Sequence, residues 1–349
     1  MRGLAFLLYK DMKKIKIYDS KSGYFNAENV ITSQFKFIFV TGARGTGKTF
    51  STLLYLIKKN IKTGKPFIYL RRTQDESDLQ ANENTSSITK VLKYLDLEYS
   101  FGKLSKKVGV IYVNEKPLIY TAGLRTFASI RGVNFDDVNE AIYDEFICEP
   151  HVPSFKAEGM ALMNFYESVN RNRELEGDKP LKLICLSNSL NIANDTFMEF
   201  DLVTPAENLT TSGDEIYIRN DILLIIMQDS PISRKKAQTS LYQNASEEYS
   251  AMAINNKFIL NDFTYVKHRS LKEYRILFQV GDLYFYKHKN KYEYYCTFSK
   301  SITKKVYSSG VADLERFRRA EWKYYVKYLD GYVTFDTYKA IALFEKYYK

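Results

Sequence analysis

The sequence predicts an α/β fold built on a mostly parallel sheet, followed by a smaller α+β domain. Short apolar, β-branched runs alternate with stretches of helical periodicity over the first part of the chain. That alternation is typical of parallel strands whose two faces are both covered by helices. After about residue 226 the pattern changes to a polar helical stretch and then to closely spaced strands with short turns.

Charge and aromatic content divide the chain in a similar way. Residues 258–349 carry 18 Lys+Arg against 10 Asp+Glu, which is +8 of the net charge of +10, and Tyr and Phe are dense there. We therefore predict an α/β domain at 1–226, a helical linker at 227–257 and a basic, aromatic-rich domain at 258–349. Basic residues interleaved with aromatic ones suit a nucleic-acid backbone and stacked bases. A solvated lysine-rich face over a tyrosine-rich core explains the same composition.

The periodicity assigns elements in order along the chain. In the first domain they are a strand at Phe35–Val40, a turn at Gly42–Gly47, a helix at Lys48–Lys62, a strand at Pro66–Leu70, a hairpin within 108–121, a strand at 141–146, a helix at Phe155–Asn170 and a strand at 181–188. In the last domain they are strands at 263–268, Tyr274–Val280, 283–288 and 292–298, a helix at Val311–Leu329, and a final short strand and helix.

The turn after the first strand carries a phosphate-binding signature, G-x-x-x-x-G-K-[ST], with the required strand before it and helix after it. Its residues, called here the phosphate loop, are Gly42, Ala43, Arg44, Gly45, Thr46, Gly47, Lys48 and Thr49. The glycines let backbone N–H groups form an anion nest, to which the helix N-terminus adds positive charge. Lys48 is expected to reach the β- and γ-phosphates of ATP, and the Thr49 hydroxyl to bind Mg²⁺. A glycine-rich turn that matches by accident is the alternative.

Two acids at a strand end supply the second half of the predicted site. Asp144 closes the apolar run of 141–143 and is placed to hold Mg²⁺ through water. Glu145 follows directly and can polarise a water for in-line attack on the γ-phosphate. An acidic pair after a strand is otherwise a solvated turn, but after a phosphate loop it indicates an ATPase. The predicted fold is therefore a P-loop NTPase of the additional-strand, catalytic-glutamate type.

Residues at other strand ends are candidates for coupling hydrolysis to motion. Ser187 and Asn188 end a strand and are predicted to sense the γ-phosphate, with an ordinary strand cap as the alternative. Arg71 and Arg72 end another strand and, with Arg131 in the stretch FASIRGVNF, are candidates for contacts with DNA or phosphate.

Two arginines upstream of the strand at 181–188 are candidates for an arginine finger, which completes the site of a neighbouring subunit in a ring. They are Arg171 and Arg173. Surface ion pairs with Glu167 or Glu174 are the alternative reading of both residues.

Composition also excludes several classes of protein. No apolar run approaches the about 20 residues that span a bilayer, and the first residues lack a small-residue cleavage site, so we expect neither a membrane span nor a signal peptide. Cys148, Cys185 and Cys296 are scattered without a C-x-x-C pair, which fits a reducing cytoplasm. The three histidines have no zinc spacing, so a metal is expected to be held by oxygen ligands.

With these motifs in place, the chain resembles the DNA-packaging (encapsidation) ATPases of phi29-like tailed phages. The matching stretches are GARGTGKT, FIYLRR, DEFI, RNRE followed by ICLSN, then NKFI and DGYVTFD. They occur in the family's order over nearly the whole chain. The chain departs from the family in being longer before the phosphate loop and in carrying the insertion LEGDKP between RNRE and ICLSN.

The resemblance implies a motor related to the large terminase ATPases. Such a motor forms a homomeric ring of five subunits at the portal of an empty capsid, in the host cytoplasm, and drives double-stranded DNA inward while docked on a structural packaging RNA. It is not expected in the mature virion. Lys48, Asp144 and Glu145 fall on the family's catalytic positions, and Arg171 falls on its trans-acting arginine finger. Arg131 falls where relatives carry a lysine, which keeps the charge but not the geometry.

The resemblance also implies that the last domain is an RNase-H-like nuclease that has lost its chemistry. A two-metal nuclease needs several converging carboxylates, one of them in the first strand. The strand Tyr274–Val280 contains none, Asp282 lies in the turn after it, and Asp330 and Asp336 come late. We therefore expect no DNA cutting, and a basic surface for DNA, RNA or portal contacts. Any other small α+β domain is the alternative without the resemblance.

Three rival functions share parts of this pattern. A helicase-type translocase on single strands would use the same phosphate loop and acids. A large terminase with a working nuclease would add metal-dependent cutting. A nucleic-acid-binding assembly protein could use the nucleotide only as a structural clamp, although binding alone does not need Glu145.

Overall fold

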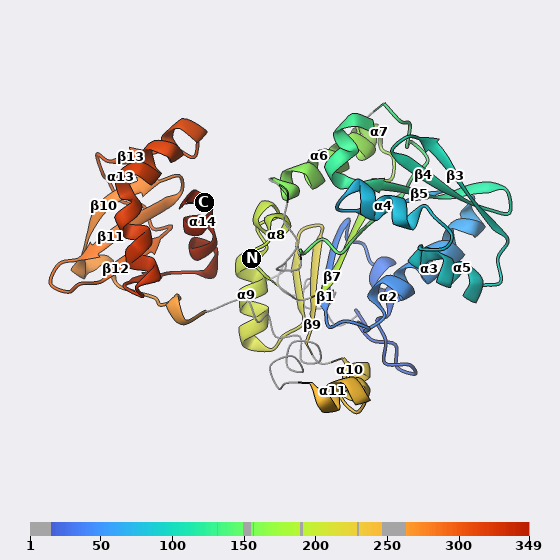
Figure 1. Ribbon diagram of the computed structural model, residues 1–349, viewed down its shortest axis with the longest axis horizontal. Coiled ribbons are helices and arrows are strands. Elements are labelled where there is room, and N and C mark those ends of the chain that lie inside the picture. Colours follow the sequence, from blue (N-terminus) through green and yellow to red (C-terminus); the bar gives the residue numbers. More distant parts are fainter. Residues whose placement is uncertain are drawn as a thin grey trace. The chain divides into compact units, whose positions relative to one another are not determined.

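The computed structural model describes residues 15–130, 132–148, 155, 157–188, 191–228, 230–245 and 263–348. The chain divides into two compact units, Met1–Ile259 and Leu260–Lys349, and Figure 1 labels many of the elements of each. No helix within the described ranges is both long enough and apolar enough to cross a membrane.

The first unit is built on a nine-stranded sheet with the order β3-β4-β5-β2-β6-β7-β1-β9-β8. Neighbours from β5 through β9 run parallel, while β3, β4 and β8 add antiparallel pairs at the two edges. The sheet is thus mostly parallel, as predicted. Its strands are β1 Phe37–Gly42, β2 Phe67–Arg71, β3 Tyr99–Ser105, β4 Val108–Val113, β5 Lys116–Gly123, β6 Glu140–Asp144, β7 Lys182–Asn188, β8 Ile216–Arg219 and β9 Ile222–Met227.

Helices cover both faces of this sheet (Figure 1), and β1 illustrates why. Side chains alternate along a strand, so Ile38 and Val40 join one apolar cluster with residues of α2, α3 and α5. Phe39 points the other way, with its ring centroid 4.9 Å from that of Phe200. The helical elements are α2 Ala27–Ile31, α3 Lys48–Thr63, α4 Gln74–Gln80, α5 Ser87–Tyr94, the 3₁₀ helix η1 Leu124–Ile130, α6 Glu158–Asn170, α7 Arg173–Glu176, α8 Asp195–Glu199, α9 Val203–Ser212, α10 Pro231–Lys236 and α11 Ser240–Asn244.

The strand register places the predicted site residues at one edge of the sheet. Gly42 at the end of β1 lies opposite Asn188 at the end of β7, and Asp144 at the end of β6 lies opposite Leu186. Because all three strands are parallel, their carboxyl ends open at the same edge, where ligands bind in open α/β sheets.

Most predicted elements of this unit are present, with shifted ends. The first strand begins two residues later than predicted, and the following helix ends at Thr63 rather than Lys62. The edge strand β3 was not predicted because none of its residues is buried. The β8–β9 hairpin was also missed, although Asn220, with φ of +51°, forms a turn of the type that asparagine favours.

The second unit is a five-stranded sheet with the order β13-β10-β11-β12-β14, and α13 and α14 belong to the same unit. β10, β11 and β12 form the predicted antiparallel meander. Phe285 of β11 packs between the sheet and α14. Its ring centroid lies 4.9 Å from that of Phe278 in β10 and 5.7 Å from that of Phe344 in α14. The elements are η2 Phe263–Tyr265, η3 Leu271–Glu273, β10 Tyr274–Val280, β11 Leu283–His288, β12 Tyr294–Thr297, β13 Val306–Tyr307, α13 Val311–Leu329, β14 Val333–Phe335 and α14 Tyr338–Tyr348.

The predicted strand at 263–268 is wrong. Its alternating residues form the 3₁₀ turn η2, and Val266 makes a single bridge with Phe335. The aromatic side chains pack on helices instead of entering the sheet: Phe263 contacts Tyr338 of α14, and Tyr265 contacts Tyr328 of α13.

Candidate active site

The phosphate loop joins β1 to α3 through two left-handed turns. Gly45 and Gly47 have φ of +73° and +86°, a left-handed conformation that glycine adopts readily because it has no Cβ. Gly47 is the N-cap of the 16-residue helix α3, so the positive end of the helix dipole faces the loop. The local sequence therefore builds an anion nest of backbone N–H groups.

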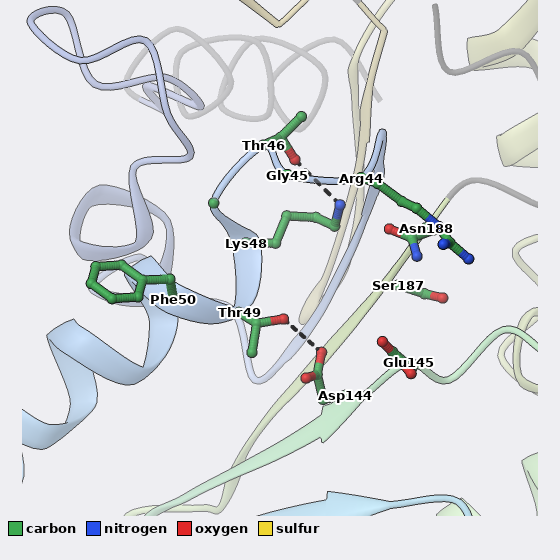
Figure 2. A pocket seen from close by; sticks show the side chains of 11 residues that line it. Arg44, Gly45, Thr46, Lys48, Thr49, Phe50, Asp144, Glu145, Ser187 and Asn188 are labelled. Carbon is green, nitrogen blue, oxygen red and sulfur yellow. Dashed lines mark hydrogen bonds between the residues drawn. The ribbon is translucent and has the colours of Figure 1, made fainter. Parts of the chain in front are cut away.

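Lys48 folds back over this nest. Its Nζ donates hydrogen bonds of 2.9 Å to the carbonyl oxygens of Gly42 and Ala43, and one of 3.3 Å to Oγ1 of Thr46. Figure 2 shows the ammonium pointing into the loop. Burial lowers the pKa of Lys48 from its ordinary value of 10.5 to about 7, against the opposing effect of Asp144. An anion bound in the nest would supply the counter-charge that this buried amine lacks.

Asp144 is buried at the end of β6 and is held from two sides. The Thr49 hydroxyl donates to its Oδ1 at 2.9 Å (Figure 2), and the Tyr69 hydroxyl donates to its Oδ2 at 2.6 Å. Burial raises the pKa of Asp144, while Arg71 and these hydrogen bonds lower it. Tyr69 was not predicted at the site, because only the pairing of β2 with β6 brings it there.

The donor set at Asp144 fits Mg²⁺. The ion prefers hard oxygen ligands and is usually held by one or two carboxylates together with substrate phosphates and water. Thr49 and Asp144 offer one hydroxyl and one carboxylate side by side. Among the described residues no three His, Cys, Asp or Glu side chains form a further metal group.

Glu145 projects from a left-handed backbone into the open part of the site. Its φ is +59°, its N–H donates to the carbonyl of Leu186 at 2.7 Å, and its side chain is 56% exposed. Arg71 holds the carboxylate, with Nη2 2.5 Å from its Oε2 and Nη1 3.6 Å from Oδ2 of Asp144. Arg71, expected as a DNA contact, thus lies between the two acids of the site, with only 13% of its side chain exposed.

The phosphate loop, Asp144 and Glu145 line one cavity of about 380 Å³, within the size range of small-molecule sites. Ser187 accepts a hydrogen bond of 3.1 Å from the backbone N–H of Ile147 and so ties the end of β7 to the segment after Glu145. The described residues that line the cavity are Arg44, Gly45, Thr46, Gly47, Lys48, Thr49, Phe50, Asp144, Glu145, Ser187 and Asn188 (Figure 2). The phosphate loop, the two acids and the predicted sensor pair are therefore brought together.

Arg171 does not line this cavity. It follows the last residue of α6 with φ of +48°, its side chain is 52% exposed, and Nη1 lies 3.0 Å from Oδ1 of Asp136. Arg173 is buried and donates to the backbone carbonyls of Phe135, Asp136 and Val138. Because Arg171 is exposed, it can contact another molecule. Arg173 could do so only by breaking its buried hydrogen bonds to the backbone carbonyls.

The expectation that Arg72 and Arg173 contact DNA or a neighbouring subunit does not agree with their positions. Arg72 is 3% exposed and forms a forked pair with Glu158, with Nε–Oε1 and Nη2–Oε2 distances of 3.1 and 3.0 Å. Contact with an outside phosphate would leave Glu158 buried and unpaired, which is strongly unfavourable. Arg131 lies outside the described residues.

Comparisons with known proteins show the family to which the chain belongs. Residues 19–336 match the podovirus DNA encapsidation protein (Gp16) family. The DNA packaging proteins of Bacillus phages PZA and phi29 are each 27% identical over 268 residues, covering 74% of this chain and 73% of the relative. A solved structure of the bacteriophage phi29 viral genome packaging motor assembly contains a chain of similar fold, with a TM-score of 0.66, 24% identity and coverage of 93% of this chain and 100% of that one.

The family match spans the phosphate loop, both acids, Arg171 and most of the second unit. The chain belongs to the podovirus DNA encapsidation protein (Gp16) family.

Proposed function

We propose that this chain is the ATPase of a viral packaging motor, which hydrolyses ATP to drive double-stranded DNA into a preformed capsid. The observation that carries the proposal is the convergence of Lys48, Thr49, Asp144 and Glu145 on one cavity in a chain of the DNA encapsidation family. The sheet order supports the additional-strand class of P-loop ATPase, because β7 lies between β1, which leads into the phosphate loop, and β6, which carries the acids.

The residues divide the chemistry between binding and activation. The loop amides and Lys48 bind the β- and γ-phosphates, and Thr49 with Asp144 would hold Mg²⁺, which neutralises charge as the phosphoryl group transfers. Glu145 orients the attacking water and accepts its proton. Arg71 pairs with Oε2 of this carboxylate in the structure.

Coupling between hydrolysis and movement is assigned to the sensor pair and to Arg171. Ser187 and Asn188 line the cavity where the γ-phosphate would lie, so its release changes their contacts directly. Arg171 is exposed and is proposed to act on the nucleotide of a neighbouring subunit. That assignment requires a ring, for which we propose five subunits, docked on a packaging RNA at the portal of the capsid in the host cytoplasm.

The second unit is proposed to contact nucleic acid or the portal and not to cut DNA. The proposal assigns 1–226 to the ATPase domain, 227–257 to a helical linker and 258–349 to an RNase-H-like domain; residues 246–257 of the proposed linker lie outside the described residues. The β10–β12 meander followed by α13 supports that likeness. Inactivity is inferred from the first strand, Tyr274–Val280, which carries no carboxylate for a two-metal site.

The proposal is tested on blunt linear duplex DNA with ATP, Mg²⁺ and purified empty capsids. We expect ATP-dependent protection of the DNA from added nuclease, with both strands remaining paired and uncut. Release of single strands would favour a helicase, and metal-dependent cutting would favour an active terminase nuclease. If the protein binds duplex DNA but does not hydrolyse ATP in the presence of capsids, the result would favour an assembly protein in which the nucleotide is only a structural clamp.

A further inference from the structure

A second lysine lies on the phosphate loop, and it comes from the segment after the sheet. Lys236, the last residue of α10, donates a hydrogen bond from Nζ to the carbonyl oxygen of Arg44. The same Nζ is so close to Gly45 that a Cβ added there would lie 2.7 Å from it. Arg44 and Gly45 both line the nucleotide cavity. Lys236 therefore sets a second ammonium group at the rim of the anion nest.

The fold explains why α10 reaches this place. β9 runs parallel to β1, with Met227 opposite Gly42, so the chain leaves β9 at the edge where the phosphate loop begins. α10 starts at Pro231, directly after its N-cap Ser230, and Pro231 packs against Gly23. The last turn of α10, which carries Lys236, then lies against the loop.

The electrostatics of the loop point to an anionic ligand between the two lysines. After burial, the positive charge of Lys236 is one of the causes that lower the pKa of Lys48. The two ammonium groups therefore repel each other across the nest. The described contacts of the Lys236 ammonium are the Arg44 carbonyl oxygen and the ring of Tyr242, whose centroid lies 5.4 Å away. Phosphate groups bound in the nest would turn this repulsion into two attractions.

We infer that Lys236 contacts the terminal phosphates of the bound nucleotide together with Lys48, so that α10 forms part of the nucleotide site. This inference rests on the proposed function, because it needs a nucleotide in the phosphate loop. α10 and α11 precede the chain that leads to the second unit, Leu260–Lys349. Bound phosphate would therefore hold the start of that connection, and loss of phosphate would release it.

The rival explanation is that Lys236 only ties α10 to the loop through the Arg44 carbonyl. Three variants of the full chain separate the two roles. Lys236→Gln keeps a hydrogen-bond donor and removes the charge, whereas Lys236→Arg keeps the charge. Lys235→Gln is the matched control, since it removes one charge from an exposed neighbour on the same helix.

Equilibrium binding of ATP, ADP and AMP is measured for each variant and for Lys48→Ala. We expect Lys236→Gln to weaken ATP binding about tenfold or more, as loss of a charge-assisted hydrogen bond does. Lys236→Arg should retain most of the affinity, and Lys235→Gln should match the wild type. AMP binding should change little in all of these variants.

Failure of the Lys236–phosphate contact and failure of the nucleotide site itself give different binding results. If Lys236→Gln binds ATP as tightly as Lys235→Gln, the phosphate contact is wrong, whatever its effect on thermal unfolding of the nucleotide-free chain. If the wild type does not bind ATP, or binds it no better than Lys48→Ala, the proposed nucleotide site itself fails.

Hydrogen exchange provides a readout that a simple tether would not change. ATP should slow exchange of the backbone amides of 231–244 in the wild type and in Lys235→Gln, but not in Lys236→Gln. Equal protection in all three chains would contradict a phosphate contact by Lys236, and no protection in the wild type would contradict the link to α10.

Discussion

The hydroxyl of Thr49 lies 2.9 Å from Oδ1 of Asp144, although 95 positions separate the two residues in the sequence. The contact joins the first turn of α3 to the end of β6. It brings the loop that would hold the phosphates next to the carboxylate that would hold the metal.

Arg71 is predicted to set the acid limb of ATP hydrolysis. Burial raises the pKa of Asp144 and Arg71 lowers it, so replacing Arg71 with Ala should raise that pKa further. Asp144 would then take up a proton at a higher pH, and the acid limb of kcat/KM should move to higher pH. Arg71→Lys, which keeps the charge, should move it less. An unchanged acid limb in Arg71→Ala would contradict this role.

Lys48 is predicted to take up a proton when ATP binds. Its pKa is about 7 in the nucleotide-free chain, and triphosphate stabilises the ammonium form. Above pH 7 the affinity for ATP should therefore fall by up to about tenfold per pH unit. Calorimetry at pH 8 in buffers of different ionisation enthalpy should detect the proton. Affinity that is constant from pH 7 to 9 would contradict the prediction.

The same shift has a consequence for stability without nucleotide. The folded-state pKa of Lys48 lies below its ordinary value of 10.5, so the unfolded chain binds more protons between these values. The contribution of Lys48 to the free energy of unfolding therefore rises as pH increases from about 7. Above pH 7 the contribution of Lys48 to stability should therefore rise while the affinity for ATP falls, so the two effects can be measured separately.

Arg171 is predicted to act on the nucleotide of a neighbouring subunit. Lys48→Ala and Arg171→Ala rings should each hydrolyse ATP poorly. In an equal mixture, about a quarter of the interfaces would pair an intact phosphate loop with an intact arginine, so part of the activity should return. Arg219→Ala, which breaks a comparable exposed pair with Asp201, should remain active. No recovery in mixed rings would contradict the trans assignment.

The pair between Arg72 and Glu158 is predicted to stabilise the first unit. Both side chains are at most 5% exposed, so Arg72→Met would leave a buried carboxylate without its partner. We expect the free energy of unfolding to fall by about 3–5 kcal/mol, measured by urea denaturation. Arg219→Met, at a more exposed pair, should cost less than about 1 kcal/mol. Equal effects would contradict the role of burial.

The parts of this site that the sequence predicts are local. The phosphate loop needs only a strand, glycines at the left-handed positions and a helix start, all of which lie within 37–63. Asp144 and Glu145 can be predicted because they close an apolar strand. The helix at Val311–Leu329 coincides with its predicted bounds, since its polar and apolar residues repeat with a helical period.

The parts that the sequence did not predict depend on strand order. Tyr69 and Arg71 share one face of β2 as residues i and i+2, but only the pairing of β2 with β6 brings them to Asp144. Lys236 reaches the loop only because β9 lies next to β1. Arg72 was expected at the surface because a basic residue at a strand end is usually solvated. Its buried partner Glu158 is 86 positions away in the sequence, so the pair is visible only in the structure.

Glu145 is predicted to activate the water for the hydrolysis that drives packaging, and Glu145→Gln removes the carboxylate that this role requires. The variant should bind ATP, and with empty capsids and blunt duplex DNA it should release phosphate at least about 100-fold more slowly than the wild type and protect no DNA from nuclease. If it releases phosphate and packages DNA at the wild-type rate, the prediction is wrong.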